Sequence, residues 1–202
     1  MRIGLFGGSF DPIHYGHIKP VREAAEQLGL ERVIYLPTAV PPHKLAREFA
    51  PARARFTMVE LALLDEEGFY ASPFEMASDQ PAFTIDSVEH FRGLYPEAEL
   101  HVILGGDNLA ELMEWRRWQD LAKEAWLAIL VRPDWLLEEI QSKLPPELRE
   151  LAESERVRFV TNRPVDISAT HLRRLLSAGT EIPPGVVPPL VLKYVRKYSL
   201  YR

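Results

Sequence analysis

The 202-residue chain contains no cysteine, and this absence excludes disulfide bonds and zinc sites built on thiolates. No apolar run approaches the roughly 18 residues that a membrane-spanning helix needs, and residues 1–30 do not have the pattern of a signal peptide. Positive charge is not in excess, because 24 lysines and arginines stand against 29 aspartates and glutamates, a net charge of −5. We therefore expect a cytoplasmic protein that binds neither membranes nor nucleic acid, and that binds any phosphate at a local site.

The composition is that of a globular protein, with 47% hydrophobic and 26% charged residues. The length suits one domain with a sizeable core. We expect a single nucleotide-binding domain over residues 1–202, with a C-terminal helical part from about residue 168 to residue 202. A charged, helix-forming stretch at residues 134–155 is expected to lie off the main fold.

Short apolar segments alternate with amphipathic segments, and this alternation predicts an α/β fold. The expected strands are residues 2–6, 32–36, 69–72, 100–104, 126–131 and 157–160, and the main expected helices are residues 17–28, 52–64 and 84–94. We expect Thr84 to cap the last of these helices. Nearly continuous apolar strands favour a doubly wound, mostly parallel, Rossmann-like sheet with helices on both faces.

Ligands of such sheets bind beyond the carboxyl ends of the strands, where the strand order reverses. Four parts of the sequence that carry glycine, histidine or charge follow expected strands. They are residues 7–17, residues 41–44, residues 105–107 and Arg132. We expect them to converge at one edge of the sheet.

The most informative segment is residues 7–17, with the sequence GGSFDPIHYGH. Its glycines allow the backbone to approach a ligand closely, and the helix expected after it favours anions at its amino end. His14 and His17 stand three residues apart at that helix start. A lone histidine would more often be structural, but two in this glycine-rich context indicate a phosphate site. Neither of the commoner nucleotide motifs, G-x-G-x-x-G and G-x-x-x-x-G-K-[ST], is present.

A second segment, residues 167–176 with the sequence ISATHLRRLL, predicts a helix with Ser168 as its N-cap. At 100° per residue, one face of this helix is apolar and is made of Leu172, Leu175 and Leu176. Thr170 and Arg173 lie on the opposite face. Two hydroxyls and a guanidinium at a helix start can bind an anion. Taken alone, the segment is equally consistent with a capped helix whose basic face is solvated.

Together the two segments resemble the nucleotidyltransferase superfamily, whose signature contains the tetrad H-x-G-H, here residues 14–17. Shorter motifs narrow the resemblance to bacterial nicotinate mononucleotide adenylyltransferases and extend it over nearly the whole chain. They are PPHK at residues 41–44, FT at 83–84, GGD at 105–107, Trp115, VRP at 131–133 and the ending KYSLYR at 197–202. The resemblance implies transfer of an adenylyl group from ATP to nicotinate mononucleotide in NAD biosynthesis, with release of pyrophosphate.

The resemblance also implies roles for particular residues. The catalytic residues would be His14, His17 and Arg173. The ATP-binding residues would be Gly7, Gly8, Ser9, Phe10, His14, His17, Ser168, Thr170 and Arg173. The residues that bind nicotinate mononucleotide would be His43, Lys44, Thr84, Asp107, Trp115 and Arg132. Mg²⁺ would be held mainly by the ATP phosphates, with no protein ligand. The partners would be ATP and nicotinate mononucleotide, and the sequence leaves a homo-oligomer open.

Two other functions stay open at this point. A pantetheine-phosphate adenylyltransferase also joins ATP to a phosphate, but it normally has a shorter chain and lacks the PPHK and FT segments. A non-catalytic nucleotide-binding module would need phosphate donors but not both imidazoles.

Overall fold

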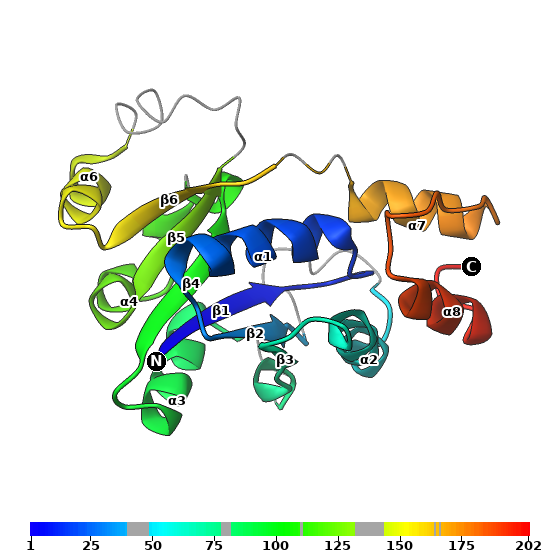
Figure 1. Cartoon of the computed structure of the whole chain (residues 1–202), viewed down its shortest axis with the longest axis horizontal. Helices are drawn as coiled ribbons and strands as arrows, with labels where there is room; N and C mark the ends of the chain where they lie inside the picture. The colour runs from blue at the N-terminus through cyan, green and yellow to red at the C-terminus, as the bar shows by residue number, and fades with distance from the viewer. Residues whose placement is uncertain (40–48, 78–81, 110, 132–143, 164, 166) are drawn as a thin grey trace. The chain divides into compact units, whose positions relative to one another are not determined.

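A computed structural model describes residues 1–39, 49–77, 82–109, 111–131, 144–163, 165 and 167–202 (Figure 1). Six strands form one sheet in the order β3-β2-β1-β4-β5-β6. The strands are β1 (Arg2–Gly8), β2 (Arg32–Pro37), β3 (Phe69–Ala71), β4 (Glu99–Gly105), β5 (Trp126–Val131) and β6 (Val157–Thr161). The pairs β1–β4, β4–β5 and β5–β6 are parallel. The predicted α/β fold with a doubly wound parallel sheet is therefore confirmed.

Helices follow the strands along the chain, and the last two, α7 and α8, come after β6. The helices are α1 (Tyr15–Leu28), α2 (Ala52–Leu63), α3 (Thr84–Leu94), α4 (Trp118–Glu124), α6 (Pro146–Glu153), α7 (Ala169–Ser177) and α8 (Pro189–Lys197). Three short 3₁₀ helices are η1 (Phe74–Met76), η2 (Gly106–Leu109) and η3 (Leu112–Glu114). Within the described residues, no helix has the length and apolar character needed to span a membrane.

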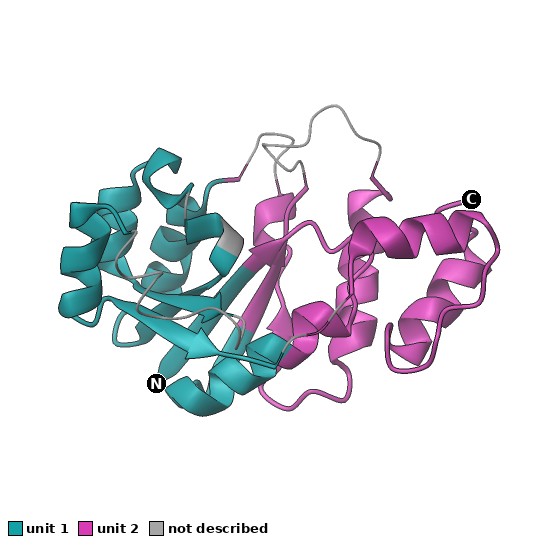
Figure 2. Cartoon of the chain, turned by 90° about the horizontal axis from the view of Figure 1, so that it is seen from above, with its two compact units in different colours: residues 1–6, 20–33, 83–164 teal, residues 7–19, 34–82, 165–202 magenta. Residues whose placement is uncertain are grey.

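The chain divides into two compact units (Figure 2). Unit 1 contains residues 1–6, 20–33 and 83–164, and unit 2 contains residues 7–19, 34–82 and 165–202. Strands β1 and β2 each contribute residues to both units. The expectation of a single domain over the whole chain stays a prediction.

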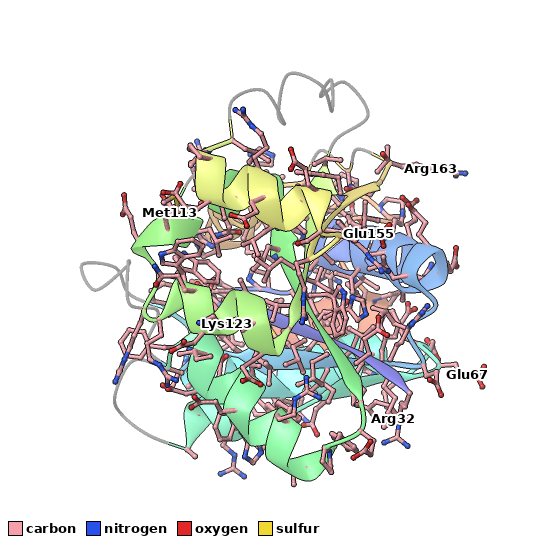
Figure 3. The ribbon with its side chains drawn as sticks, turned by 90° about the vertical axis from the view of Figure 1, so that its left-hand side faces the viewer. Arg32, Glu67, Met113, Lys123, Glu155 and Arg163 are labelled. Atoms are coloured by element: carbon pink, nitrogen blue, oxygen red, sulfur yellow. The ribbon has the colours of Figure 1, made fainter. Side chains whose placement is uncertain are left out.

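Unit 1 is built on four neighbouring strands whose apolar side chains are buried. In the register of the sheet, Ile3 lies beside Leu100, and Leu127 lies beside Val157. Helix α3 packs on β4, α4 on β5 and α6 on β6. Burial of these continuous apolar strands under helices is the main force that stabilises the unit. Charged side chains point outward from it, as Figure 3 shows for Lys123, Glu155 and Arg163.

Unit 2 has a buried arginine at its centre. Arg55 of α2 is 1% exposed, and its guanidinium donates to four backbone carbonyls. The acceptors are Ser9 O at 2.7 Å, Thr38 O at 2.8 Å, Ala39 O at 2.9 Å and Ala50 O at 3.0 Å. Ser9 and Thr38 directly follow β1 and β2. One side chain therefore fixes the chain where it leaves the carboxyl ends of two strands.

Two helix starts differ from the sequence prediction. Helix α1 begins at Tyr15 rather than at His17, because the Nδ1 atom of His14 accepts a hydrogen bond from Gly16 N at 3.1 Å and so acts as the cap. Helix α3 has Phe83 as its N-cap, with no side-chain cap, and Thr84 is its first residue. Histidine and phenylalanine are not among the preferred capping residues, so neither position is recognisable from propensity.

Two other expectations concern helices near the end of the chain. Ser168 is the N-cap of α7, as predicted, and its hydroxyl accepts from His171 N at 3.4 Å. In the charged stretch expected to be helical, α6 begins at Pro146, a residue type well suited to the first helical position. Residues 132–143 lie outside the described residues.

We predict that Arg55→Met lowers the free energy of unfolding by about 3 kcal/mol or more, because four buried or part-buried backbone carbonyls lose their charged donor. Arg53→Met, two residues earlier on the same helix and exposed, is the matched control and should change stability by less than about 0.5 kcal/mol. Urea denaturation of both variants measures the difference. Equal stabilities would contradict the role assigned to Arg55.

Candidate active site

The two imidazoles of the tetrad stack on each other at the start of α1. Their ring centroids are 3.8 Å apart and the planes differ by 27°. The Nδ1 atom of His14 accepts from Gly16 N at 3.1 Å, and the Nδ1 atom of His17 accepts from His14 N at 3.3 Å. A backbone amide can only donate, so each Nδ1 is an acceptor and the proton of each neutral ring lies on Nε2. The site therefore contains two N–H donors of defined tautomer.

His14 is 4% exposed, and burial lowers its pKa to about 4. Desolvation causes this shift, because burial disfavours the charged ring. At neutral pH the ring is uncharged, so it offers a phosphate a hydrogen bond without a full positive charge. Positive charge for a polyphosphate has to come from another residue.

Glycine at two positions of the segment is required by ring packing. A Cβ atom on Gly16 would lie 2.8 Å from His14 Nδ1, and a Cβ atom on Gly8 would lie 2.9 Å from the Phe10 ring. Phe10 is buried, has φ = 45° and meets the His17 ring edge-on, with centroids 5.3 Å apart. The glycines therefore let the aromatic rings close on the backbone, which holds both imidazoles in place.

The start of α7 lies beside the tetrad. An ideal Cβ on Gly16 would lie 3.5 Å from the Cβ of Ile167, which precedes the capping residue Ser168. On α7 the guanidinium of Arg173 donates through Nη2 to Thr170 Oγ1 at 2.8 Å. The structure thus brings the start of α7 beside the segment that carries the two imidazoles. All nine residues expected to bind ATP belong to unit 2.

Three buried polar residues near this site were not selected from the sequence. Arg55 is described above. Asp11 is 2% exposed, and its Oδ1 atom accepts from Tyr201 Oη at 2.7 Å. Nothing in a sequence pattern could find this contact, because 190 residues separate its two partners.

The third missed residue is Glu75 in η1. It is buried, and its Oε2 atom accepts from Thr38 Oγ1 at 2.9 Å. An ideal Cβ on Gly7 would lie 3.8 Å from the other carboxylate oxygen, so the carboxylate lies beside the end of β1. Acceptor oxygens at this position suit a hydroxyl or a cation rather than a phosphate. Glu75 lies in no motif, so a sequence pattern does not point to it.

Thr84 and Trp115, two residues expected to bind the pyridine nucleotide, lie on neighbouring elements of unit 1. Thr84 is the first residue of α3, and Trp115 follows η3 in an extended conformation. Both are half-buried. The guanidinium of Arg116 lies over the Phe83 ring, 4.6 Å from its centroid, so the segment after η3 packs against the start of α3. The ion pair Arg117–Glu89, at 2.9 Å, joins the same two elements.

Four other residues were expected to bind the pyridine nucleotide, and the structure describes the location of one of them. Asp107 belongs to η2, directly after β4. His43, Lys44 and Arg132 lie outside the described residues. Within residues that the structure describes, no cluster of three or more histidines, aspartates and glutamates could hold a metal ion.

The class of protein follows from a match between residues 5–175 and the cytidylyltransferase-like family. Among relatives, a probable nicotinate-nucleotide adenylyltransferase of Aeromonas hydrophila is 39% identical, with 99% of this chain and 97% of the relative covered. One of Neisseria meningitidis serogroup B, also a probable nicotinate-nucleotide adenylyltransferase, is 36% identical over 99% of this chain and 98% of its own. The chain therefore belongs to the nicotinate-nucleotide adenylyltransferase family.

Solved structures show the same fold. The nicotinic acid mononucleotide adenylyltransferase of Plasmodium falciparum, in a complex with NaAD, superposes with a TM-score of 0.74. The superposition covers 99% of this chain and 97% of the Plasmodium falciparum chain, and the two sequences are 19% identical.

We predict that Gly16→Ala destabilises the protein by about 1–3 kcal/mol, because its Cβ would overlap the His14 ring. Gly93→Ala in α3 is the matched control, since a Cβ there meets no atom within 4 Å. Alanine in a helix is favoured over glycine, so this control should be neutral or stabilising by up to about 1 kcal/mol. Thermal unfolding compares the two. Equal effects would contradict the packing assigned to Gly16.

Proposed function

We propose that this protein transfers the adenylyl group of ATP to nicotinate mononucleotide, giving nicotinic acid adenine dinucleotide and pyrophosphate. Membership of the nicotinate-nucleotide adenylyltransferase family supports the proposal. The structural observation that carries it is that one segment, residues 11–17, holds both imidazoles with Nε2–H as the donor and also accepts a hydrogen bond from the guanidinium of Arg173 at Asp11 O. We also propose a cytoplasmic location, which the lack of cysteine favours.

The reaction follows from the charges of the two substrates. The 5′-phosphate of the mononucleotide attacks the α-phosphorus of ATP in line, and a new P–O bond forms. The bond between the α-phosphorus and the oxygen that bridges it to the β-phosphate breaks, and pyrophosphate leaves. The attacking phosphate is already ionised, so the protein needs neither a nucleophile nor a general base. Catalysis then depends on holding two polyanions in line and on stabilising the charge that develops.

The residues of α1 and the loop before it would bind the α-phosphate. The imidazoles of His14 and His17 donate from Nε2, and His17 stabilises the α-phosphate oxygens as charge builds. Because His14 is neutral, it supplies a hydrogen bond and no net charge. The backbone of residues 7–10 would lie close to the nucleotide, because Gly7 and Gly8 have no side chain and that of Ser9 is small.

The residues of α7 would bind the β- and γ-phosphates. The hydroxyls of Ser168 and Thr170 and the guanidinium of Arg173 gather at the amino end of a nine-residue helix. The helix dipole adds to the attraction for a polyanion. This arrangement stabilises pyrophosphate as it leaves.

Magnesium would be bound mainly through the ATP phosphates. The donor set around the phosphates consists of imidazole N–H, hydroxyl and guanidinium groups, which bind phosphate oxygens and are not preferred ligands of Mg²⁺. These residues therefore fit a metal held by the substrate itself. When bound, the ion neutralises part of the phosphate charge.

Selection of the acid over the amide would occur in unit 1. The N-cap Phe83 offers no side-chain acceptor to the first amides of α3, so the amide of Thr84 can donate to the nicotinate carboxylate. Trp115 would stack on the pyridine ring and Asp107 would accept from ribose hydroxyls. Lys44, together with His43, would bind the mononucleotide phosphate, and Arg132 would also bind the mononucleotide.

The proposal is tested by pyrophosphate release from ATP and Mg²⁺ with three acceptors: nicotinate mononucleotide, nicotinamide mononucleotide and phosphopantetheine. We expect rapid release with the first, slower release with the second and none with the third. Equal rates with the acid and the amide would contradict the role of Thr84. Release with phosphopantetheine alone would replace the proposed substrate.

The same assay separates chemistry from folding at the tetrad. His17→Ala should lower kcat by about 10²- to 10³-fold, the scale for losing one preorganised donor. The control His171→Ala, on the exposed face of α7, should leave kcat unchanged. Near-normal turnover of His17→Ala would mean that this ring only supports the fold.

A further inference from the structure

Asp11 links the phosphate-binding segment to three distant parts of unit 2. Its Oδ1 atom accepts from Tyr201 Oη at 2.7 Å and from Ala50 N at 3.1 Å. Its backbone oxygen accepts from Arg173 Nη1 at 2.6 Å, and its Oδ2 atom lies 3.9 Å from the same nitrogen. The carboxylate is 2% exposed, so water does not compete for these contacts.

Arg173 is oriented by these contacts on one side and by its own helix on the other. Its Nη1 atom faces Asp11, while Nη2 donates to Thr170 Oγ1 at 2.8 Å. A guanidinium is planar and rigid, so two anchored nitrogens fix the direction of the whole group. The position of Asp11 therefore determines where Arg173 presents its charge.

Tyr201 is the last residue but one of the chain, and the backbone is shaped to bring it back to Asp11. Ser199 and Tyr201 both have positive φ, 53° and 66°. The chain end lies beside α7 and α8 in Figure 1. Left-handed backbone at two nearby non-glycine residues costs free energy, and the phenol contact with a buried carboxylate offsets that cost.

The surroundings of Asp11 keep the phenol of Tyr201 protonated, so that it stays a donor to the Asp11 carboxylate. Burial, and then the negative charge of Asp11, hold the pKa of Tyr201 far above its usual range, so the phenol remains a donor. Burial lowers the pKa of Arg55, and the carboxylate of Asp11 raises it. Asp11 thus interacts with the cations of both Arg55 and Arg173, and the neutral phenol supplies a hydrogen bond to its Oδ1.

We propose that Tyr201 is a positioning residue for ATP: its phenol fixes the Asp11 carboxylate, and Asp11 orients the guanidinium of Arg173 toward the phosphates. This inference rests on the proposed role of Arg173 in phosphate binding. The end of the chain then contributes to the affinity for ATP without touching the nucleotide. A purely structural role of Tyr201 would instead affect stability and leave affinity unchanged.

The test is Tyr201→Phe, which keeps the ring and removes only the hydroxyl. We expect the KM for ATP to rise about tenfold, the scale of one hydrogen bond to a charged group, with kcat changed less than about threefold. The KM for nicotinate mononucleotide should not change. The matched control is Tyr198→Phe, because Tyr198 is in the same tail and 56% exposed. It should leave both KM values as they are.

A double-mutant cycle shows whether Tyr201 acts through Arg173. Tyr201→Phe is compared in the wild-type protein and in Arg173→Lys, which keeps the charge and loses the planar group. We expect the tenfold effect on ATP to shrink to less than about twofold in the lysine background. An undiminished effect there would overturn the proposed route through Arg173.

Calorimetric titration with Mg-ATP separates this inference from the proposed function. Tyr201→Phe should bind ATP about tenfold more weakly than the wild type, whether or not nicotinate mononucleotide is the acceptor. Equal ATP affinity, with only a lower melting temperature, would overturn the inference. If Tyr201→Phe does not fold, Asp11→Asn, which keeps the acceptor for Tyr201 and removes the charge facing Arg173, should weaken ATP binding similarly. Unchanged affinity in that variant would equally overturn it.

Discussion

Two hydrogen bonds from backbone amides to imidazole Nδ1 atoms determine what this site can do. They come from Gly16 to His14 and from His14 to His17, and they leave the N–H of each ring on Nε2. Because a ring whose Nδ1 accepts cannot also be protonated there, the bonds favour neutral imidazoles with one defined donor. Preorganised donors of this kind do not reorganise when charge develops in a transition state, which is why they are effective in catalysis.

The positive charge of the site and its imidazole hydrogen-bond donors come from different residues. The neutral ring of His14 contributes no positive charge, whereas Arg173 carries a permanent one and is held by Asp11 and Thr170. Arg55 donates to the carbonyls of Ser9 and Thr38 and so fixes the chain directly after β1 and β2. In the proposed reaction this division would favour turnover, because a cation held at the β,γ-phosphates would favour departure of pyrophosphate, while a neutral His14 would not hold the substrate too tightly.

Much of the fold was predictable because the core strands are continuous apolar runs. The bounds of β5 were predicted at both ends, and the other strands within two residues at either end. The cap of α7 was predictable because serine is a common capping residue. The cap of α1 was not, because it is an imidazole. Prediction from sequence works where the signal is local and chemically typical.

The residues of the candidate site also fall into those that the sequence indicates and those that only the structure shows. The glycines and histidines of residues 7–17 form one continuous pattern, so the sequence alone identified them. Asp11 belongs to the same segment, but its partner Tyr201 is 190 residues away, so the contact is not visible in the sequence. Arg55 looks like an ordinary helix arginine until the structure buries it. Long-range polar contacts leave no periodicity in a sequence, so the residues that hold a site in place are harder to find than those that touch the ligand.

The pH dependence of His14 gives the account a thermodynamic consequence. Its pKa is about 4 in the folded protein and about 6.5 in an unfolded chain, so the unfolded state binds more protons between these values. Stability from this group is complete above about pH 6.5 and is lost as the pH falls toward 4. The same neutral state is needed for the Nδ1 atom of His14 to accept from Gly16 N.

The most direct measurement is a ¹⁵N NMR titration of the histidine rings in the intact protein. The account predicts that His14 stays neutral, with its proton on Nε2, until the pH approaches 4. The His17 ring should show the same tautomer at neutral pH. A proton on Nδ1 of either neutral ring, or titration of His14 near the ordinary histidine value, would contradict it.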